Sequence, residues 1–246
     1  MYSLTLVLLI IYLVAIKPIK SIWFEYYGEV AQPFLTDRFI SVEDYPYMVG
    51  IVYLVNTKKI EQRHMCSGSI INTNGVVVTA ASCKHKLDSK RYSLTRTKVT
   101  GGSEYWDYCN CGVGKVYDIA YFAVHPNFIP ADRHNESSIP RNDVAVIKLR
   151  TIPKWDARSF RVGWPEVAIQ DSTLQVLGWG YITDDLKCTQ NFHMLDFNRC
   201  QRFIGKKRIA LPRNVFCLRL KGQSNSIDVG SPVIWKDPNG KEIILI

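Results

Sequence analysis

Short apolar runs separated by polar turns dominate the chain. Runs rich in β-branched and aromatic residues predict strands at 47–54, 69–80, 115–124, 144–149, 174–177 and 231–235. Turn-forming residues lie at N-T-N-G 72–75, H-P-N 125–127 and D-P-N-G 237–240. Helical periodicity is weak, and no internal repeat or low-complexity tract is present. The sequence therefore predicts an all-β fold, either a barrel or a sandwich.

The amino-terminal stretch at 4–16 is almost wholly apolar. It is shorter than the roughly 20 residues of a membrane span. It therefore predicts the apolar region of a signal peptide covering residues 1–21, cleaved between Ala15 and Ser21. An uncleaved anchor is the alternative. No later stretch is apolar enough over a sufficient length, so we expect no membrane span after removal of the signal.

Cysteine usage agrees with export. The 246 residues are 47% hydrophobic, enough for a sizeable core, and include seven cysteines. Together with a signal peptide they predict an oxidising compartment, disulfides and extracellular localisation. The odd count leaves at least one thiol unpaired or paired with another chain. The triplet Asn135-Glu136-Ser137 predicts a glycosylation site at Asn135.

The chain is basic, with a formal net charge of +9 and basic runs at 84–86 and 206–208. We interpret this excess either as a solvated face or as a surface for an anionic polysaccharide. No zinc-finger spacing, helical basic region or RNA-binding signature is present, so no nucleic-acid partner is predicted. The pair Cys109-Asn110-Cys111 lacks a second ligand cluster, so neither a metal site nor a cofactor is predicted.

Seven segments resemble, in the expected order, those of the chymotrypsin/trypsin-like serine protease family. They are Y-P-Y-M-V 45–49, C-S-G-S-I-I 66–71, V-T-A-A-S-C 78–83, V-H-P-N-F 124–128, N-D-V-A-V-I-K-L 142–149, G-W-G 178–180 and D-V-G-S-P 228–232. The resemblance implies two packed six-stranded antiparallel β-barrels with the active site between them. On this basis, residues 22–246 form a trypsin-like domain, with a first barrel at about 40–150 and a second at about 165–246.

The resemblance places three residues at the catalytic positions. Asp143 matches the aspartate that orients the histidine, Ser82 stands in place of that histidine, and Val229 stands in place of the nucleophilic serine. Valine has no nucleophilic atom, and a serine hydroxyl has too high a pKa to act as a general base near neutral pH. We therefore expect a protein that is not a peptidase.

No neighbouring side chain is expected to replace the missing groups. His85 lies beyond the disulfide cysteine, His64 matches a structural histidine, and Ser231 is two residues past the nucleophile position. The backbone N–H groups that would stabilise an oxyanion include that of Ile227, where the family has glycine. A β-branched residue resists unusual backbone angles, so we expect this geometry to be lost.

Substrate recognition and activation also depart from the family pattern. Gln223 stands where trypsin-like enzymes carry an aspartate, so the specificity pocket lacks its charge. The match ends before the S-W-G strand of the pocket, and Asn225 replaces a cysteine. We therefore expect either a second barrel that is truncated or a sequence that is a truncated gene product. F-L-T-D 34–37 stands in place of the activation terminus I-V-G-G. We therefore expect Asp228, the usual partner of that terminus, to be retained without this usual partner.

The resemblance also implies two disulfides, Cys66–Cys83 and Cys200–Cys217. Cys109, Cys111 and Cys188 remain. We predict a bridge between Cys188 and one of the other two, because the matching loops of the two barrels lie close together in the family.

Taken together, these expectations describe a secreted, non-catalytic serine protease homologue that acts as a binding or regulatory module. By analogy with the family fold, its partner is expected to be a protease, an inhibitor or a surface receptor. A trypsin-like endopeptidase with rearranged catalysis and a truncated gene product are the alternatives.

Overall fold

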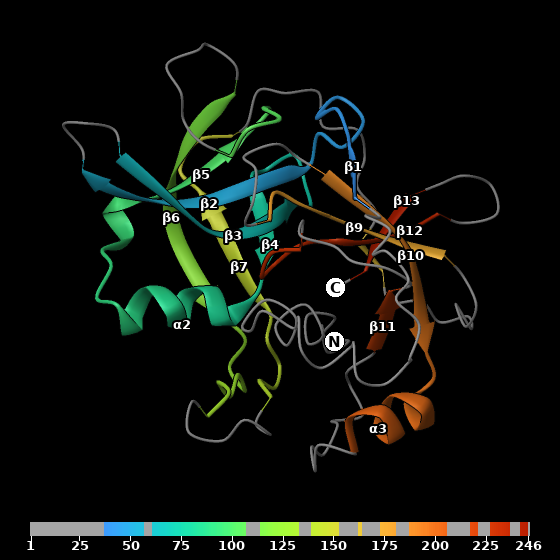
Figure 1. Cartoon of the computed structure of the whole chain (residues 1–246). Coiled ribbons are helices and arrows are strands. Elements are labelled where there is room, and N and C mark those ends of the chain that lie inside the picture. Colours follow the sequence, from blue (N-terminus) through green and yellow to red (C-terminus); the bar gives the residue numbers. More distant parts are fainter. Residues whose placement is uncertain are drawn as a thin grey trace.

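The computed structural model describes residues 37–56, 61–106, 114–132, 139–152, 162–163, 173–180, 187–205, 217–220, 227–236 and 242–245. In these ranges strands dominate, with two α-helices, α2 (Ala81–Ser89) and α3 (Phe197–Gly205), and one 3-10 turn, η1 (Leu94–Arg96) (Figure 1). The all-β prediction is confirmed. Several predicted features lie outside the described residues: the signal peptide, Asn135, Cys109, Cys111, Gln223 and Asn225.

Six antiparallel strands close into a barrel in the order β2-β3-β4-β7-β6-β5. Their bounds are β2 Met48–Asn56, β3 Glu61–Ile70, β4 Val76–Thr79, β5 Thr97–Gly101, β6 Lys115–Val124 and β7 Ala145–Leu149. Fully buried aliphatic side chains, among them Ile51, Val77 and Ile147, fill the interior. Closure leaves no unpaired edge in this half of the molecule.

Strand β6 shows how side-chain alternation adapts to the barrel. Tyr117 and Ile119 point inward two positions apart, but the next inward residue is Phe122. The pairing with β7 shifts register between Ile119 and Tyr121. This bulge inserts one residue and leaves Tyr121 half exposed on the outer face.

The run at 69–80 forms two strands instead of one. β3 ends at Ile70 and β4 begins at Val76. Between them, Oδ1 of Asn72 accepts hydrogen bonds from the N–H groups of Asn74 (3.0 Å) and Val76 (3.1 Å). Gly75 has a φ of 71°, which favours glycine. The turn residues therefore override the apolar pattern.

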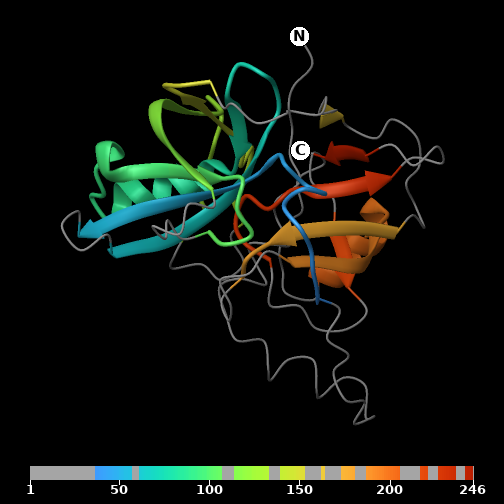
Figure 2. The same ribbon diagram turned by 90° about the horizontal axis from the view of Figure 1, so that it is seen from above.

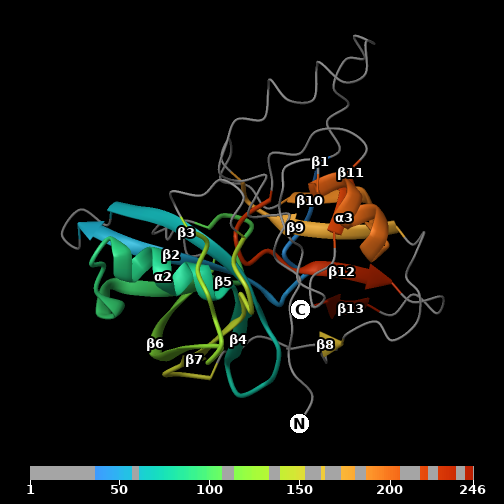
Figure 3. The ribbon, with the colours of Figure 1, turned by 90° about the horizontal axis from the view of Figure 1, so that it is seen from below.

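The second half is a seven-stranded sheet in the order β1-β10-β9-β12-β13-β8, with β11 beside β10. Its strands are β1 Asp37–Phe39, β8 Val162–Gly163, β9 Thr173–Gly178, β10 Lys187–Leu195, β11 Cys217–Leu220, β12 Val233–Lys236 and β13 Glu242–Leu245. Figures 2 and 3 show the barrel and this sheet as two lobes side by side. The arrangement is consistent with the expected two-barrel fold.

A second apolar cluster joins the two lobes. It combines Tyr45, Tyr47, Met48, Val78 and Val144 from the barrel side with Leu177, Trp179 and Ile234 from the sheet. Trp179 is 1% exposed, and its Nε1–H donates to the backbone oxygen of Glu104 at 2.7 Å. The G-W-G segment is thereby fixed against the barrel. Within the described residues, no helix has the length and apolar character needed to cross a membrane.

Candidate functional site

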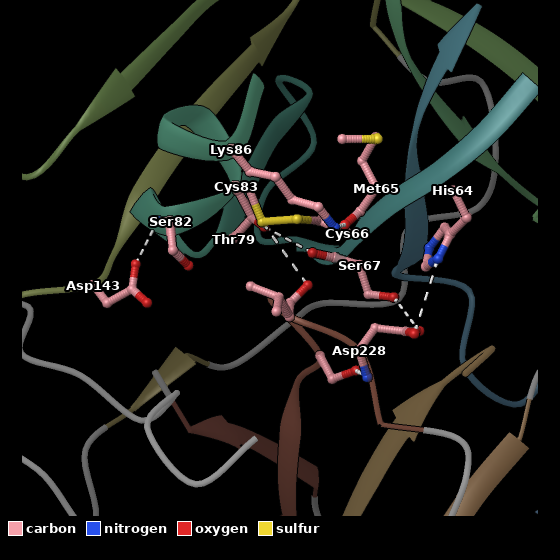
Figure 4. The surroundings of a disulfide bond; sticks show 12 residues. His64, Met65, Cys66, Ser67, Thr79, Ser82, Cys83, Lys86, Asp143 and Asp228 are labelled. Carbon is pink, nitrogen blue, oxygen red and sulfur yellow. Dashed lines mark hydrogen bonds and ion pairs between the residues drawn. A yellow bond between two sulfur atoms is a disulfide. The ribbon is translucent and has the colours of Figure 1, made fainter. Parts of the chain in front are cut away.

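Ser82 and Asp143 meet at one end of the barrel. Ser82 lies in the first turn of α2, and Asp143 lies two residues before β7. The backbone N–H of Ser82 donates to Oδ1 of Asp143 at 2.6 Å (Figure 4). Ala80, the residue that precedes α2, offers no side-chain cap. Asp143 therefore caps the amino end of α2 from a distant part of the chain, where a negative charge is favourable.

The surroundings of Asp143 make its charge costly. Its side chain is 1% exposed, and burial raises its pKa from 3.8 to about 6; hydrogen bonds from the backbone N–H groups of Ser82 and Ala81 act in the opposite direction. Among the described residues, Oδ2 of Asp143 and Oγ of Ser82 make no hydrogen bond. Among the described residues, the pair therefore consists of an ionisable carboxyl group and a buried hydroxyl, and neither Oδ2 nor Oγ is hydrogen-bonded to an imidazole.

Val229 lies in a turn that rests on β3. Its backbone oxygen accepts a hydrogen bond from the N–H of Ser67 at 2.8 Å and lies 3.9 Å from Sγ of Cys83. Its side chain is partly buried against the barrel core. Gly230 follows with a φ of 86°, and a Cβ there would lie 2.1 Å from the backbone oxygen of Ser67. Only glycine fits this position, so the turn is held tightly beside residues 82 and 83.

The residues next to Val229 in the sequence pack in the core or hydrogen-bond within the turn. Ile227 is 6% exposed and belongs to the hydrophobic core. The non-glycine residues with positive φ in the described ranges are Arg91 and Asn142, so Ile227 keeps an ordinary backbone. Ser231 is 1% exposed, and its Oγ accepts the N–H of Asp228 at 3.0 Å. His85 stands on the exposed side of α2, with its ring centroid 6.3 Å from that of Phe128.

The carboxylate of Asp228 has several partners from within the chain, and its expected lack of an activation terminus as partner stays a prediction. Oδ2 accepts hydrogen bonds from Oγ of Ser67 at 2.9 Å and from the N–H of Trp179 at 2.8 Å. Oδ1 accepts the N–H of Gly180 at 3.1 Å and lies 3.9 Å from Nδ1 of His64. The His64 ring is flanked by Trp106 and Trp179, with centroids 5.6 and 5.7 Å away. Donors from both lobes therefore satisfy this buried carboxylate, and Figure 4 shows its contacts with Ser67 and His64 from the barrel.

Ser67 is the residue that sequence reasoning missed. The segment C-S-G-S-I-I at 66–71 resembles the family pattern C-G-G-S-L-I, but the first glycine of that pattern is a serine here. The serine hydroxyl that replaces the glycine hydrogen atom at position 67 is visible in the sequence and could have indicated a new hydrogen bond. Its target, Asp228, is 161 positions away, so only the folded structure identifies the contact.

Both predicted disulfides are confirmed. Cys66–Cys83 and Cys200–Cys217 form, with Cα atoms 6.2 and 5.8 Å apart. Cys188 lies in β10 opposite Leu177 of β9 and Arg38 of β1. Its bridge to Cys109 or Cys111 remains a prediction. In the described part of the chain, no three His, Cys, Asp or Glu side chains gather as metal ligands would.

Comparison with known proteins assigns the family. The trypsin family model matches residues 40–244. Venom serine protease of Polistes dominula is 27% identical over 191 residues, covering 74% of this chain and 64% of that protein. Venom serine protease 34 of Apis mellifera is 22% identical over 215 residues, covering 83% and 49%. Hypodermin-B of Hypoderma lineatum is 27% identical over 148 residues, covering 58% and 47%.

The chain thus spans between about half and two thirds of the length of these curated relatives. The family match covers both the barrel and the second sheet, and with them the segments that contain Ser82, Asp143 and Val229. The chain belongs to the trypsin family of serine proteases.

Proposed function

We propose that this protein is a non-catalytic member of the trypsin family that acts as a binding or regulatory module. The observation that carries the proposal is Val229, an apolar side chain partly buried at the turn where the family carries its nucleophile. Valine cannot attack a carbonyl carbon. Ser82, at the position of the general base, has a hydroxyl that takes up no proton near neutral pH.

A structural role for Asp143 supports the proposal. Its carboxylate accepts the N–H of Ser82 at the start of α2, a segment whose preceding residue provides no cap. An aspartate can therefore be retained here without orienting a histidine, because a helix amino end needs an acceptor in any case. The residues around Val229 are likewise explained by packing of the turn on β3.

An extracellular location and a protein partner complete the proposal. Disulfides of the kind seen here persist in oxidising compartments. Two of the similar proteins are named venom serine proteases. A protease-like surface without catalysis is suited to holding a protease, an inhibitor or a surface receptor. We propose that loops between the two lobes provide this contact.

Assays for peptidase activity test the proposal directly. The purified protein is incubated with a broad peptide library and with a fluorophosphonate probe for reactive serines. We expect no cleavage and no labelling above background, since loss of nucleophile or base costs about a millionfold in turnover. Cleavage that survives repurification and disappears in Asp143→Asn would contradict the proposal.

A hydrolase with rearranged catalysis is the second candidate, and one observation favours it. The Ser82 residue is hydrogen-bonded through its backbone to Asp143, whose pKa of about 6 leaves the carboxyl group largely ionised at neutral pH. A carboxylate next to a hydroxyl is a base next to a weak nucleophile. Probe labelling mapped to Ser82, and lost in Ser82→Ala, would establish this candidate; an unlabelled Ser82 would reject it.

A further inference from the structure

Helix α2 and the segment after it concentrate positive charge on the outside of the barrel. Residues 81–96 contain five Lys or Arg side chains and a single acid, Asp88. Lys86 and Lys90 are four positions apart, so their side chains leave α2 on the same side. Figure 1 shows the helix on the flank of the barrel away from the second sheet. We name Lys86, Lys90, Arg91 and Arg96 the α2 basic surface.

Stacked aromatic rings hold two of these cations in place. The rings of Tyr53 and Tyr92 stack with centroids 4.0 Å apart and an interplanar angle of 14°. Nζ of Lys90 lies 5.9 Å from the Tyr92 centroid, and Cζ of Arg96 lies 5.1 Å from the Tyr53 centroid. Each outer face of the ring pair thus receives one cation. Arg96 also donates to the backbone oxygen of Val55, so this guanidinium is fixed by both contacts. Neither an aromatic ring nor a carbonyl group neutralises the charge of a cation.

The carboxylate of Asp88, the acid within residues 81–96, already pairs with a lysine. Asp88 accepts Nζ of Lys84 at 2.7 Å. Lys86 donates to the backbone oxygen of Met65 at 3.3 Å, and burial followed by the charge of Lys90 lowers its pKa (Figure 4). Asp228 acts on Lys86 as a partial counter-charge, raising its pKa by less than burial and Lys90 lower it. Lys90 and Arg91 keep their charges without an ion-pair partner among the described residues.

Arg91 occupies a position where glycine is preferred. After α2, the N–H of Arg91 bonds to the oxygen of Asp88, and the N–H of Tyr92 bonds to the oxygen of Leu87, both at 2.9 Å. This is the helix-terminating motif whose left-handed residue is usually glycine. Arg91 adopts it with a φ of 55° and an exposed side chain. The chain thus retains a surface cation in an unfavourable backbone conformation.

From these observations we propose that the α2 basic surface binds a sulfated polysaccharide. Cations spaced along one side of a helix match the repeated anions of such a chain. Extracellular polyanions fit a surface whose helix is anchored by the Cys66–Cys83 disulfide, because that bond requires an oxidising compartment. The large exposed apolar side chains of the described residues lie outside 81–96, which disfavours a lipid bilayer as the partner. This inference is independent of whether the protein is catalytic.

Heparin serves as the probe, and binding to the full chain is measured over a range of salt concentrations. The test variant combines Lys86→Gln, Lys90→Gln and Arg91→Gly. A matched control combines Lys115→Gln, Arg141→Gln and Arg150→Gln, three exposed cations elsewhere on the barrel. Both variants lose the same charge. Arg91→Gly relieves an unfavourable backbone angle, so the test variant is expected to remain folded, as its thermal melting will verify.

We expect the test variant to bind heparin at least about tenfold more weakly at physiological salt, with a shallower salt dependence, and the control to change much less. An unchanged affinity in the test variant, or an equal loss in both variants, would overturn the proposal. Single-stranded DNA and phosphatidylserine vesicles are measured in parallel. Tighter binding to either of them than to heparin would overturn it in favour of that partner.

Discussion

Asp143 is a buried acid that this chain uses to cap a helix, and its titration couples stability to pH. Burial raises its pKa from 3.8 to about 6, so the folded state favours the protonated carboxyl group. A raised pKa in the folded state contributes stability below the unfolded-state pKa. That contribution is lost as the pH rises through about 6.

Replacing Asp143 with asparagine should therefore change stability in a pH-dependent way. Asparagine still offers an oxygen to the N–H of Ser82 but carries no charge. We expect Asp143→Asn to gain stability relative to the wild type as the pH rises from about 4 to 7, by at most about 3 kcal/mol. Urea unfolding across this range measures the difference. Asp44→Asn, at an exposed turn residue, controls for the loss of one negative charge. If the free energy of unfolding of Asp143→Asn and of the wild type changed with pH in parallel, the expectation would be wrong.

For single residues, the sequence predicted correctly those positions that lie within a recognisable motif. Asp143 and Ser82 each lie within a matched segment, and the structure brings them together. The sequence did not identify the donors that surround Asp228. Ser67, Trp179 and Gly180 supply donors from segments far away in the chain. A sequence match assigns the acid but not the groups that the fold brings to it.

Among the elements, β3 matters most for the site, because it carries the hydroxyl that holds the 228–232 turn. We expect Ser67→Ala to destabilise the protein by about 2 kcal/mol, since a buried carboxylate loses a charge-assisted donor. Ser69→Ala is the matched control: Ser69 lies on the same strand, and its Oγ is buried without a hydrogen bond among the described residues. Denaturant unfolding at neutral pH compares the two. Equal effects would show that the Ser67 hydroxyl contributes nothing specific.

The strands were more predictable than the helices, for a physical reason. A barrel strand shows apolar residues at alternate or successive positions, and β2 and β7 follow this pattern directly. Helix α2 buries Ala81, Ser82 and Cys83 in its first turn and then only Leu87. This leaves no apolar stripe of helical period. Arg91 also takes the place of the glycine that would mark the end of the helix.

At the scale of the whole molecule, the two lobes meet at a buried carboxylate and an apolar cluster. Asp228 accepts Ser67 from the barrel and Trp179 from beside the second sheet, and Trp179 also bonds to the backbone of Glu104. The turn that bears Val229 is thus positioned by contacts internal to the chain. A substitution at residue 229 therefore acts on a turn that is already fixed in this way.

We therefore expect Ser82→His combined with Val229→Ser not to recover trypsin-like hydrolysis. The double variant would have all three residue types, but the rate depends on preorganised geometry and on donors directed at the developing oxyanion. Ile227 is packed in the core with ordinary backbone angles, and the resemblance implies that the family has glycine at this position. Hydrolysis of an arginyl ester should stay within about tenfold of that of each single variant, because groups that act as a unit contribute little separately. A double variant far more active than both single variants would show that the oxyanion site is intact and that residues 82 and 229 alone separate this chain from a working protease.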